Sequence, residues 1–298
     1  MDETLALDPV DARLPLDGPF TRGMAAAAGV QRGTLARLVR AGSVCRVLRG
    51  VYAASSAVHS PGFRASAVAL AAGPGAVVVE RTAAWVHGVD VGVLTAELPL
   101  PLDLVRPVTA GSGPSRSRLG LAGRDLQSID GLHLTTPLRT ALDLGRLLPE
   151  ADALAALDQL LRAGTFTHVQ LLAELARMAG HHGVGQLRRL AVQVDSRARS
   201  SAESALRLHW HAADLPTAVP GALVDVGGRL VRVALGVHRC QFGAVLADGL
   251  TAEDHRALRA SGWHVVVLTP ALVLGSDSAD LGRHLEREFH QHLLRQIA

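Results

Sequence analysis

Arginine side chains near the N-terminus are the residues whose type and spacing most directly suggest a chemistry. Six arginines and no acidic residue lie between Phe20 and Ser56, whereas basic and acidic residues nearly balance from residue 57 onward. A guanidinium group binds phosphate oxygens through paired hydrogen bonds, so this local excess predicts a polyanion-binding surface. The six are Arg22, Arg32, Arg37, Arg40, Arg46 and Arg49.

The helices and strands that position these arginines can be predicted from the same stretch of sequence. Thr21 is a typical N-cap for a short helix that ends at Gly29, and a second helix is expected over residues 32–41, with Gly42 at its C′ position. The following SVCRVLRGVYAA predicts two β-strands with Gly50 at the bend. Helix, turn, helix and hairpin in this order are typical of a winged helix. In that fold the second helix enters the major groove and the hairpin lies along phosphates.

We therefore expect the N-terminal module to bind double-stranded DNA. The second helix and the hairpin supply most of the candidates. An alternative is a protein-interaction module whose basic face meets an acidic partner. The expected DNA-binding residues are Arg22, Gln31, Arg32, Thr34, Arg37, Arg40, Arg46 and Arg49.

The N-terminal sequence also resembles a known family. GMAAAAGVQRGTLARLVRAGSVCRVLRGVYAA is similar to the N-terminal winged helix of AbiEi-type antitoxins of type IV toxin–antitoxin systems, which carry an R-x-x-R-G-V-Y-like wing. VVVERTAAWVHGV and TTPLRTALDL resemble segments that follow this winged helix. The resemblance implies a DNA-binding domain that often acts in autoregulation, and a cognate toxin as a possible partner.

Residues 57–198 are expected to form a mixed α/β middle region. Helices are predicted over residues 64–72 and 82–87, and a pair of amphipathic helices is predicted on either side of Pro149. The arginines of the loop 114–118 are expected to be solvated rather than bound to phosphate.

The middle region contains no clear catalytic pattern. Arg139 and Asp143 have the i,i+4 spacing of an ion pair on one helix face, and we prefer that role to catalysis. His181 and His182 are adjacent and lack a third ligand at a suitable spacing, so no histidine metal site is predicted. The chain also lacks the H-E-x-x-H, Walker, G-x-G-x-x-G and G-x-S-x-G motifs.

Residues 199–298 predict a small α/β domain with the order αββαβα and a hairpin turn at Gly227-Gly228. This part resembles the very-short-patch-repair-like endonuclease domains of the PD-(D/E)xK superfamily, giving a restriction-endonuclease-like fold. The resemblance is carried by E-S-x-L-R at residues 203–207, D-G at 248–249 and R-x-L-x-x-x-G-W at 256–263.

The nuclease resemblance implies carboxylates on two adjacent strands that hold Mg²⁺, because the metal generates the attacking water and neutralises the phosphate. In the aligned sequence Ala234 and Leu246 stand at these two positions, whereas Glu203 and Asp248 are retained. The chain has no lysine, so the motif lysine is missing too. Asp225 is expected to cap the Gly-Gly turn. We expect no catalytic residue, no metal and no cofactor. The alternative is a divergent Mg²⁺-dependent DNA endonuclease that uses Glu203, Asp225 and Asp248.

The whole sequence suggests an α/β (mixed) fold in three domains: 1–56, 57–198 and 199–298. With 48% hydrophobic and 19% charged residues the chain is expected to fold. Cys45 and Cys240 form no zinc pattern, and the acidic N-terminus lacks a signal peptide, so a cytoplasmic protein without a membrane partner is expected. The preferred function is a DNA-binding regulator or antitoxin-like protein whose nuclease-like domain is inactive.

Overall fold

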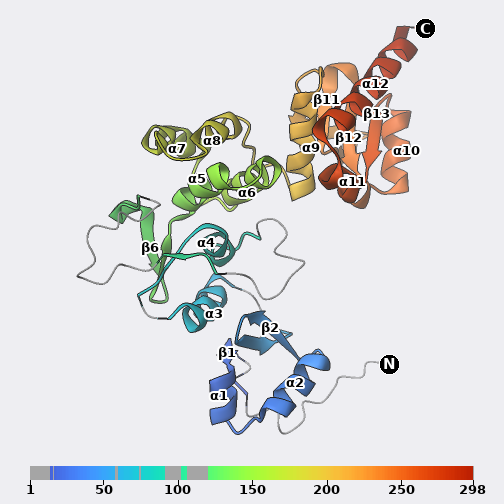
Figure 1. Ribbon diagram of the computed structural model, residues 1–298. Helices are drawn as coiled ribbons and strands as arrows, with labels where there is room; N and C mark the ends of the chain where they lie inside the picture. The colour runs from blue at the N-terminus through green and yellow to red at the C-terminus, as the bar shows by residue number, and fades with distance from the viewer. Residues whose placement is uncertain are drawn as a thin grey trace, which may run out of the picture. The chain divides into compact units, whose positions relative to one another are not determined.

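The computed structural model describes residues 14, 15, 17–57, 60–73, 75–90, 102–105 and 120–297. The chain divides into two compact units, residues 1–144 and 145–298 (Figure 1). Each unit combines helices with small sheets, so the expected mixed α/β class is confirmed. The three predicted domains, bounded after residues 56 and 198, remain predictions. The loop 114–118 lies outside the described residues.

The first unit begins with two short helices joined by a tight turn. Helix α1 spans Arg22–Ala27 and helix α2 spans Arg32–Arg40. Thr21 caps α1 as predicted, because its Oγ1 accepts a hydrogen bond from the Met24 amide at 3.2 Å. Gly29 in the turn has a φ of +82°, a conformation that glycine adopts without steric cost.

A three-stranded antiparallel sheet completes this module. It is formed by β1 (Phe20–Thr21), β2 (Val44–Leu48) and β3 (Val51–Ala54), in the order β1-β3-β2. Gly50 turns the predicted hairpin with a φ of +83°. The two helices and the sheet share a core of Leu14, Phe20, Ala25, Val30, Leu35, Leu38, Val44 and Tyr52.

The rest of the first unit is a second small sheet with helices. The helices predicted over residues 64–72 and 82–87 are confirmed as α3 (Pro61–Ala72) and α4 (Glu80–Val86). The first begins at Pro61 rather than Arg64 because Ser60 accepts the Phe63 amide at 3.2 Å and caps it. The sheet has the order β5-β4-β7-β6. These elements are α3 (Pro61–Ala72), β4 (Val77–Val78), α4 (Glu80–Val86), β5 (Leu104–Val105), β6 (Leu126–Ile129) and β7 (Leu132–Thr135).

The predicted ion pair of the middle region is confirmed and is fully buried. Helix α5 spans Pro137–Leu147, and on it Arg139 Nε lies 2.8 Å from Asp143 Oδ2. Asp125, from the short 3-10 helix before β6, adds a second carboxylate 2.9 Å from Arg139 Nη1. Burial favours a structural role because a buried guanidinium needs several acceptors.

The second unit contains a helical part and a C-terminal sheet. Its helices before the sheet are α6 (Glu150–Arg162), α7 (His168–Glu174), α8 (Val184–Ala191) and α9 (Ser201–Ala212). Helices α6 and α9 pack together, and Asp158 of α6 accepts hydrogen bonds from Ser204 and Arg207 of α9 at 2.6 and 2.5 Å. This buried polar contact fixes α9, which supplies part of the C-terminal pocket.

The C-terminal sheet has the order β13-β12-β11-β8. Only β12 and β13 run parallel; they are connected by a helix, as parallel neighbours require. Its strands are β8 (Val219–Pro220), β11 (Leu235–Val237), β12 (Phe242–Leu246) and β13 (His264–Leu268). The helices that follow its strands are α10 (Ala252–Ala260), α11 (Pro270–Gly275) and α12 (Ser278–Ile297).

Helices cover both faces of this sheet (Figure 1). Successive strand residues point to opposite faces. In β12, Ala244 and Leu246 therefore pack with α9 and α12, whereas Val245 packs with Leu258 of α10. The two central strands β11 and β12 are buried on both faces and contain no polar side chain, which is typical of strands inside an α/β layer.

A separate two-stranded hairpin lies between β8 and β11 along the chain. It pairs β9 (Leu223–Asp225) with β10 (Leu230–Arg232). The expected turn is confirmed: Gly227 and Gly228 have φ values of +77° and +87°, and Asp225 Oδ1 accepts the Gly228 amide at 2.7 Å. The predicted order αββαβα holds for α9, β11, β12, α10, β13 and α12, with the predicted hairpin before β11, but the prediction lacks β8 and α11.

Candidate nucleic-acid interface and C-terminal pocket

Helix α2 presents a basic face to the outside of the N-terminal module. Each helical residue turns the chain by about 100°, so Leu35 and Leu38 point into the core while the residues opposite them are exposed. The centre of the exposed side is formed by Gly33, which has no side chain, and Ala36, which has only a methyl group, so the backbone is accessible there. The exposed residues of α2 are Arg32, Gly33, Ala36, Arg37 and Arg40.

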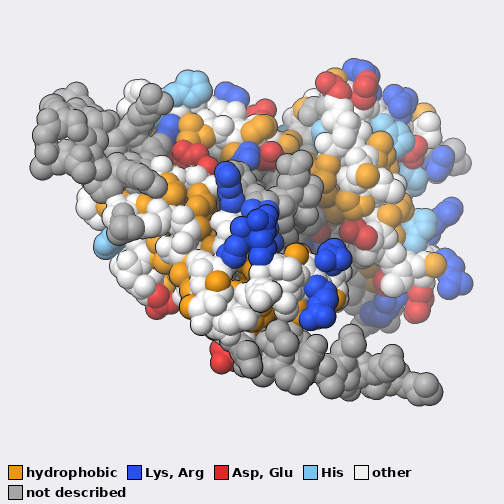
Figure 2. Space-filling view, turned by 60° about the horizontal axis from the view of Figure 1, so that its bottom comes forward, with side chains coloured by type: hydrophobic (Ala, Val, Ile, Leu, Met, Phe, Trp, Pro, Cys, Tyr) orange, Lys and Arg blue, Asp and Glu red, His pale blue; other side chains and the backbone are white. Residues whose placement is uncertain are grey.

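A hollow of about 410 Å³ lies beside this face, between α1, α2 and the β2-β3 hairpin. Arginines and apolar side chains line it together, and none of the lining residues is acidic. Figure 2 turns this end of the molecule toward the viewer, and arginine side chains gather on the face that it presents. The lining residues are Arg22, Arg32, Leu35, Ala36, Val39, Arg40, Arg46 and Tyr52.

The structure divides the eight predicted DNA-binding residues into two groups. Four arginines converge on the hollow, namely Arg22, Arg32, Arg40 and Arg46. The other four do not line it. Of these, Gln31, Arg37 and Arg49 are exposed and Thr34 is half-buried.

The sequence did not indicate that Tyr52 and the apolar side chains of α2 line this hollow. Tyr52 could not be singled out as a site residue, because the stretch VYAA at residues 51–54 has the pattern of an ordinary buried strand. Only the pairing of β3 between β1 and β2 directs the Tyr52 ring toward α2.

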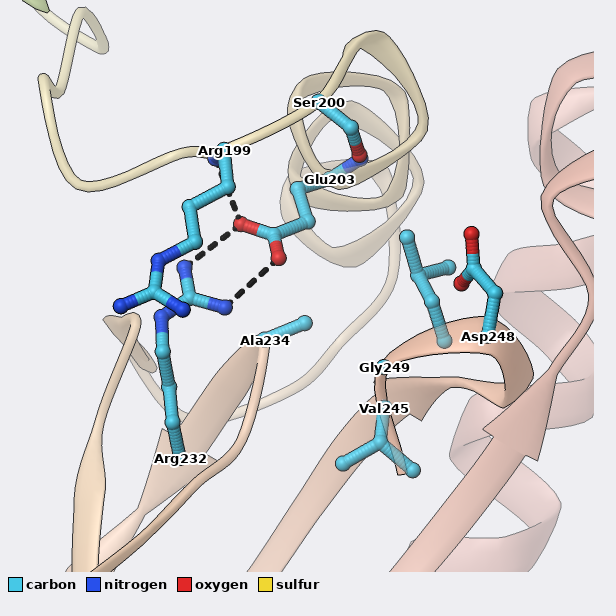
Figure 3. A pocket seen from close by; sticks show the side chains of 9 residues that line it. Arg199, Ser200, Glu203, Arg232, Ala234, Val245, Asp248 and Gly249 are labelled. Carbon is cyan, nitrogen blue, oxygen red and sulfur yellow. Dashed lines mark hydrogen bonds and ion pairs between the residues drawn. The ribbon is translucent and has the colours of Figure 1, made fainter. Parts of the chain in front are cut away.

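A second pocket, of about 220 Å³, lies in the C-terminal part (Figure 3). Two of the three candidate carboxylates, Glu203 on α9 and Asp248 after β12, line this pocket together with Ala234 and Leu246. The sequence alignment therefore brought together positions that do meet in space. Asp225 is not among the lining residues. The full lining is Arg199, Ser200, Glu203, Arg232, Ala234, Val245, Leu246, Asp248 and Gly249.

The Glu203 carboxylate accepts three hydrogen bonds from the protein. Arg232 donates from Nη1 to Oε1 and from Nη2 to Oε2, each at 2.7 Å, which is the bidentate fork that arginine forms with carboxylates. The Arg199 amide donates to Oε2 at 2.8 Å. Arg232 Nη2 also donates to the Arg197 carbonyl at 2.7 Å. Figure 3 shows this ion pair on one wall of the pocket, with Asp248 on the other.

The candidate carboxylates are not well placed to act as ligands of a divalent metal. Mg²⁺ requires several oxygen ligands that are free to approach it, and a positively charged guanidinium already holds Glu203. Asp225 is used in the Gly-Gly turn. Within the part of the chain that the structure describes, no three His, Cys, Asp or Glu side chains are grouped closely enough to hold an ion, and this includes His181 and His182.

Comparison with known proteins finds two family matches within residues 16–193. Residues 16–55 match the family described as "Transcriptional regulator, AbiEi antitoxin", and residues 76–193 match the "AbiEi antitoxin C-terminal domain". The chain contains AbiEi antitoxin family domains. The first match covers α1, α2 and the hairpin, so the AbiEi resemblance predicted for this stretch is confirmed. The nuclease resemblance of residues 199–298 remains a prediction.

Two curated proteins match most of this chain. Two uncharacterized proteins of Mycobacterium tuberculosis, from strains CDC 1551 / Oshkosh and ATCC 25618 / H37Rv, are each 28% identical over 267 residues. The aligned region is 84% of this chain and 95% of each relative. No solved structure matches the chain. In the described residues, no helix is both long and apolar enough to cross a membrane.

Proposed function

We propose that this protein is a DNA-binding transcriptional regulator of the antitoxin type, and that its N-terminal module is a winged helix. The observation that carries the proposal is the acid-free set of six arginines on a helix–turn–helix and hairpin, within the stretch that matches an AbiEi transcriptional regulator. The partner of this module is double-stranded DNA, bound in the cytoplasm. A cognate toxin is the second expected partner, as the antitoxin family name implies.

Helix α2 is the element proposed to enter the major groove. Its outer side combines small residues with Arg37 and Arg40, so the helix can approach the bases closely while two guanidinium groups reach base edges or phosphates. Arg49 next to the hairpin turn is exposed and suited to a phosphate contact along the adjacent backbone.

The C-terminal domain is proposed to be nuclease-like and inactive. Ala234 and Leu246 stand where the resemblance requires metal-binding carboxylates, and both line one pocket with the retained Glu203 and Asp248. Arg232 supplies the positive charge that Glu203 needs in its buried position. An internal ion pair in place of a metal favours a scaffold or partner-binding role over the alternative of a Mg²⁺-dependent endonuclease, which would have to use Glu203, Asp225 and Asp248.

A gel-shift titration of the full-length protein on the DNA upstream of its own gene tests this function. Arg37→Ala with Arg40→Ala removes two charges from the last turn of α2. This double variant should weaken binding and lower the salt dependence, with a slope reduced by about 0.9 for each phosphate that the protein no longer neutralises. The matched control is Arg188→Ala with Arg189→Ala, which removes two exposed arginines from the last turn of α8. Equal titrations for the two double variants would contradict the proposal.

A further inference from the structure

The hollow between α1, α2 and the hairpin is more specific than a diffuse basic surface. Its arginines come from four separate places: the first residue of α1, the two ends of α2 and strand β2. We infer that this hollow seats one backbone phosphate of bound DNA together with its deoxyribose. The inference rests on the proposed function, and it names the part of the DNA that this site takes.

Charge is the first argument for an anionic occupant. Arg22, Arg32, Arg40 and Arg46 surround one cavity, and none of the residues that line it carries a negative charge. Like charges around a partly desolvated cavity repel one another, and an anion placed between them removes this repulsion. Every other ligand class, whether neutral or cationic, would leave the four guanidinium groups uncompensated.

Arg46 provides a second, independent observation. Its Nε atom is buried and has no hydrogen-bond acceptor among the described residues. A buried donor without an acceptor is unfavourable, and guanidinium donors bind phosphate oxygens in a fork geometry. A phosphate that reaches the Arg46 fork would supply the acceptor that is missing in the free protein.

The apolar wall distinguishes a phosphate within DNA from free phosphate. Leu35, Ala36 and Val39 of α2 face the hollow, as does the ring of Tyr52. Tyr52 is held by stacking on Phe20, with ring centroids 6.1 Å apart. A free inorganic anion gains nothing from such a wall, because it remains hydrated. The C–H groups of a deoxyribose can bury apolar surface against it.

The single tyrosine of the chain makes this hollow directly observable. Full-length protein labelled with 3-fluorotyrosine carries one fluorine label, at Tyr52, and therefore gives one ¹⁹F resonance per state. A short duplex should shift this resonance, whereas inorganic phosphate at the same phosphate concentration should shift it much less. The titration is repeated with Arg46→Gln, which removes the charge, and with Arg188→Gln as a control on α8.

The Arg46→Gln variant should neutralise one phosphate of the bound DNA fewer than the wild type does. The salt slope of binding should fall by about 0.9, which corresponds to a roughly tenfold weaker affinity at 0.1 M salt, on any DNA sequence. The melting temperature of the free variant should not fall, since the variant loses a buried donor without a partner. Arg188→Gln should leave both the slope and the Tyr52 shift unchanged.

Three results would overturn the inference, and the two measurements distinguish these results from one another. If the wild type binds duplex DNA but the Tyr52 resonance does not move and Arg46→Gln keeps the full slope, the hollow is not the phosphate seat and DNA binding stands. If inorganic phosphate shifts Tyr52 as strongly as the duplex, the hollow takes a free anion instead. If the wild type binds no DNA, the proposed function fails together with the inference.

Discussion

At the scale of single residues, Arg232 and Glu203 decide the character of the C-terminal pocket. The side chains are 17% and 10% exposed, so solvent screens their interaction only weakly. A pair of this kind is costly to break from one side, because the remaining charge stays buried without a counter-ion. The pair therefore explains how a carboxylate remains in this pocket without a metal ligand set.

Arg232→Met should lower the free energy of unfolding by about 3–5 kcal/mol, since Glu203 is left buried and uncompensated. Urea unfolding measures this loss. Glu203→Gln combined with Arg232→Met should recover part of it. Arg229→Met is the matched control, because Arg229 is about half exposed and pairs with Glu253 and Asp254 at the surface. Its cost should be below about 1 kcal/mol, and equal costs for the two arginine variants would contradict this explanation.

Gly183 is a residue whose backbone position excludes every side chain. Its φ is +76°, and a Cβ atom there would lie 1.9 Å from the Arg146 carbonyl oxygen. Gly180 has a similar φ of +79°, but nothing lies within 4 Å of its Cβ position. Gly183→Ala should therefore destabilise the protein far more than Gly180→Ala, which carries only backbone strain of about 1–2 kcal/mol. Thermal unfolding of the two variants compares them, and similar melting temperatures would contradict the predicted clash.

His87 gives the stability a dependence on pH. Burial lowers the pKa of His87 below 6.5, although its hydrogen bond with the Thr135 carbonyl opposes the shift. The unfolded chain then binds a proton at a higher pH than the folded chain does. The contribution of His87 to stability is complete above pH 6.5 and is lost progressively as the pH falls from there toward the lowered pKa.

His87→Gln removes this titration. The difference in the free energy of unfolding between wild type and variant should shrink as the pH falls from about 8 to about 5. Denaturant titrations at several pH values measure the difference. A difference that stays constant or grows toward acid pH would show that His87 is not held neutral by burial.

At the scale of elements, α1, α2 and the hairpin could be predicted because local residues mark their ends. Thr21 caps a helix, and Gly29, Gly42 and Gly50 take positive φ values at the turns. β8 and β9 are only two and three residues long, and β8 is defined by pairing with β11, more than ten residues away. No local pattern encodes such a pairing, so β8 and the short α11 could not be predicted, whereas β9 could, because it is one arm of the hairpin that the Gly227-Gly228 turn marks.

The outer side of α2 is the element on which the proposed DNA contact depends. Ala36→Glu places a negative charge in the middle of this side, and glutamate is a good helix former, so the fold should be retained. Affinity for duplex DNA should fall at least tenfold or so, because the new charge faces phosphates. Fluorescence anisotropy measures the loss. Ala260→Glu at the exposed end of α10 is the control, and equal effects of the two variants would show that α2 does not face the DNA.

At the scale of the whole molecule, positive charge and carboxylates are used differently in the N-terminal module and in the second unit. The formal net charge is only +3, yet the N-terminal module carries six arginines without an acid. In the second unit, arginines such as Arg207 and Arg232 are paired with carboxylates inside the fold. This distribution favours the N-terminal module as the DNA-binding part and a non-catalytic role for the C-terminal domain.

The candidate site could be predicted only in part from the sequence. Charge counting found the arginines, but the hollow depends on how Arg22, Arg46 and Tyr52 meet across different elements. Ala234 and Leu246, which the nuclease resemblance singled out, line one pocket with Glu203, yet nothing in the sequence indicated that Arg232 would bind that carboxylate. Contacts between distant segments arise from tertiary packing, which short motifs do not encode.

The most direct measurement uses supercoiled plasmid incubated with pure full-length protein in buffer containing Mg²⁺ or Mn²⁺. One sample is run on a native gel to detect binding, and a second is treated with protease before electrophoresis to detect cleavage. A DNA-binding regulator with an inactive nuclease-like domain should retard the plasmid and leave it supercoiled after protease treatment. Nicked or linear plasmid whose formation is abolished by Glu203→Ala, or plasmid that is not retarded at all, would contradict the proposed function.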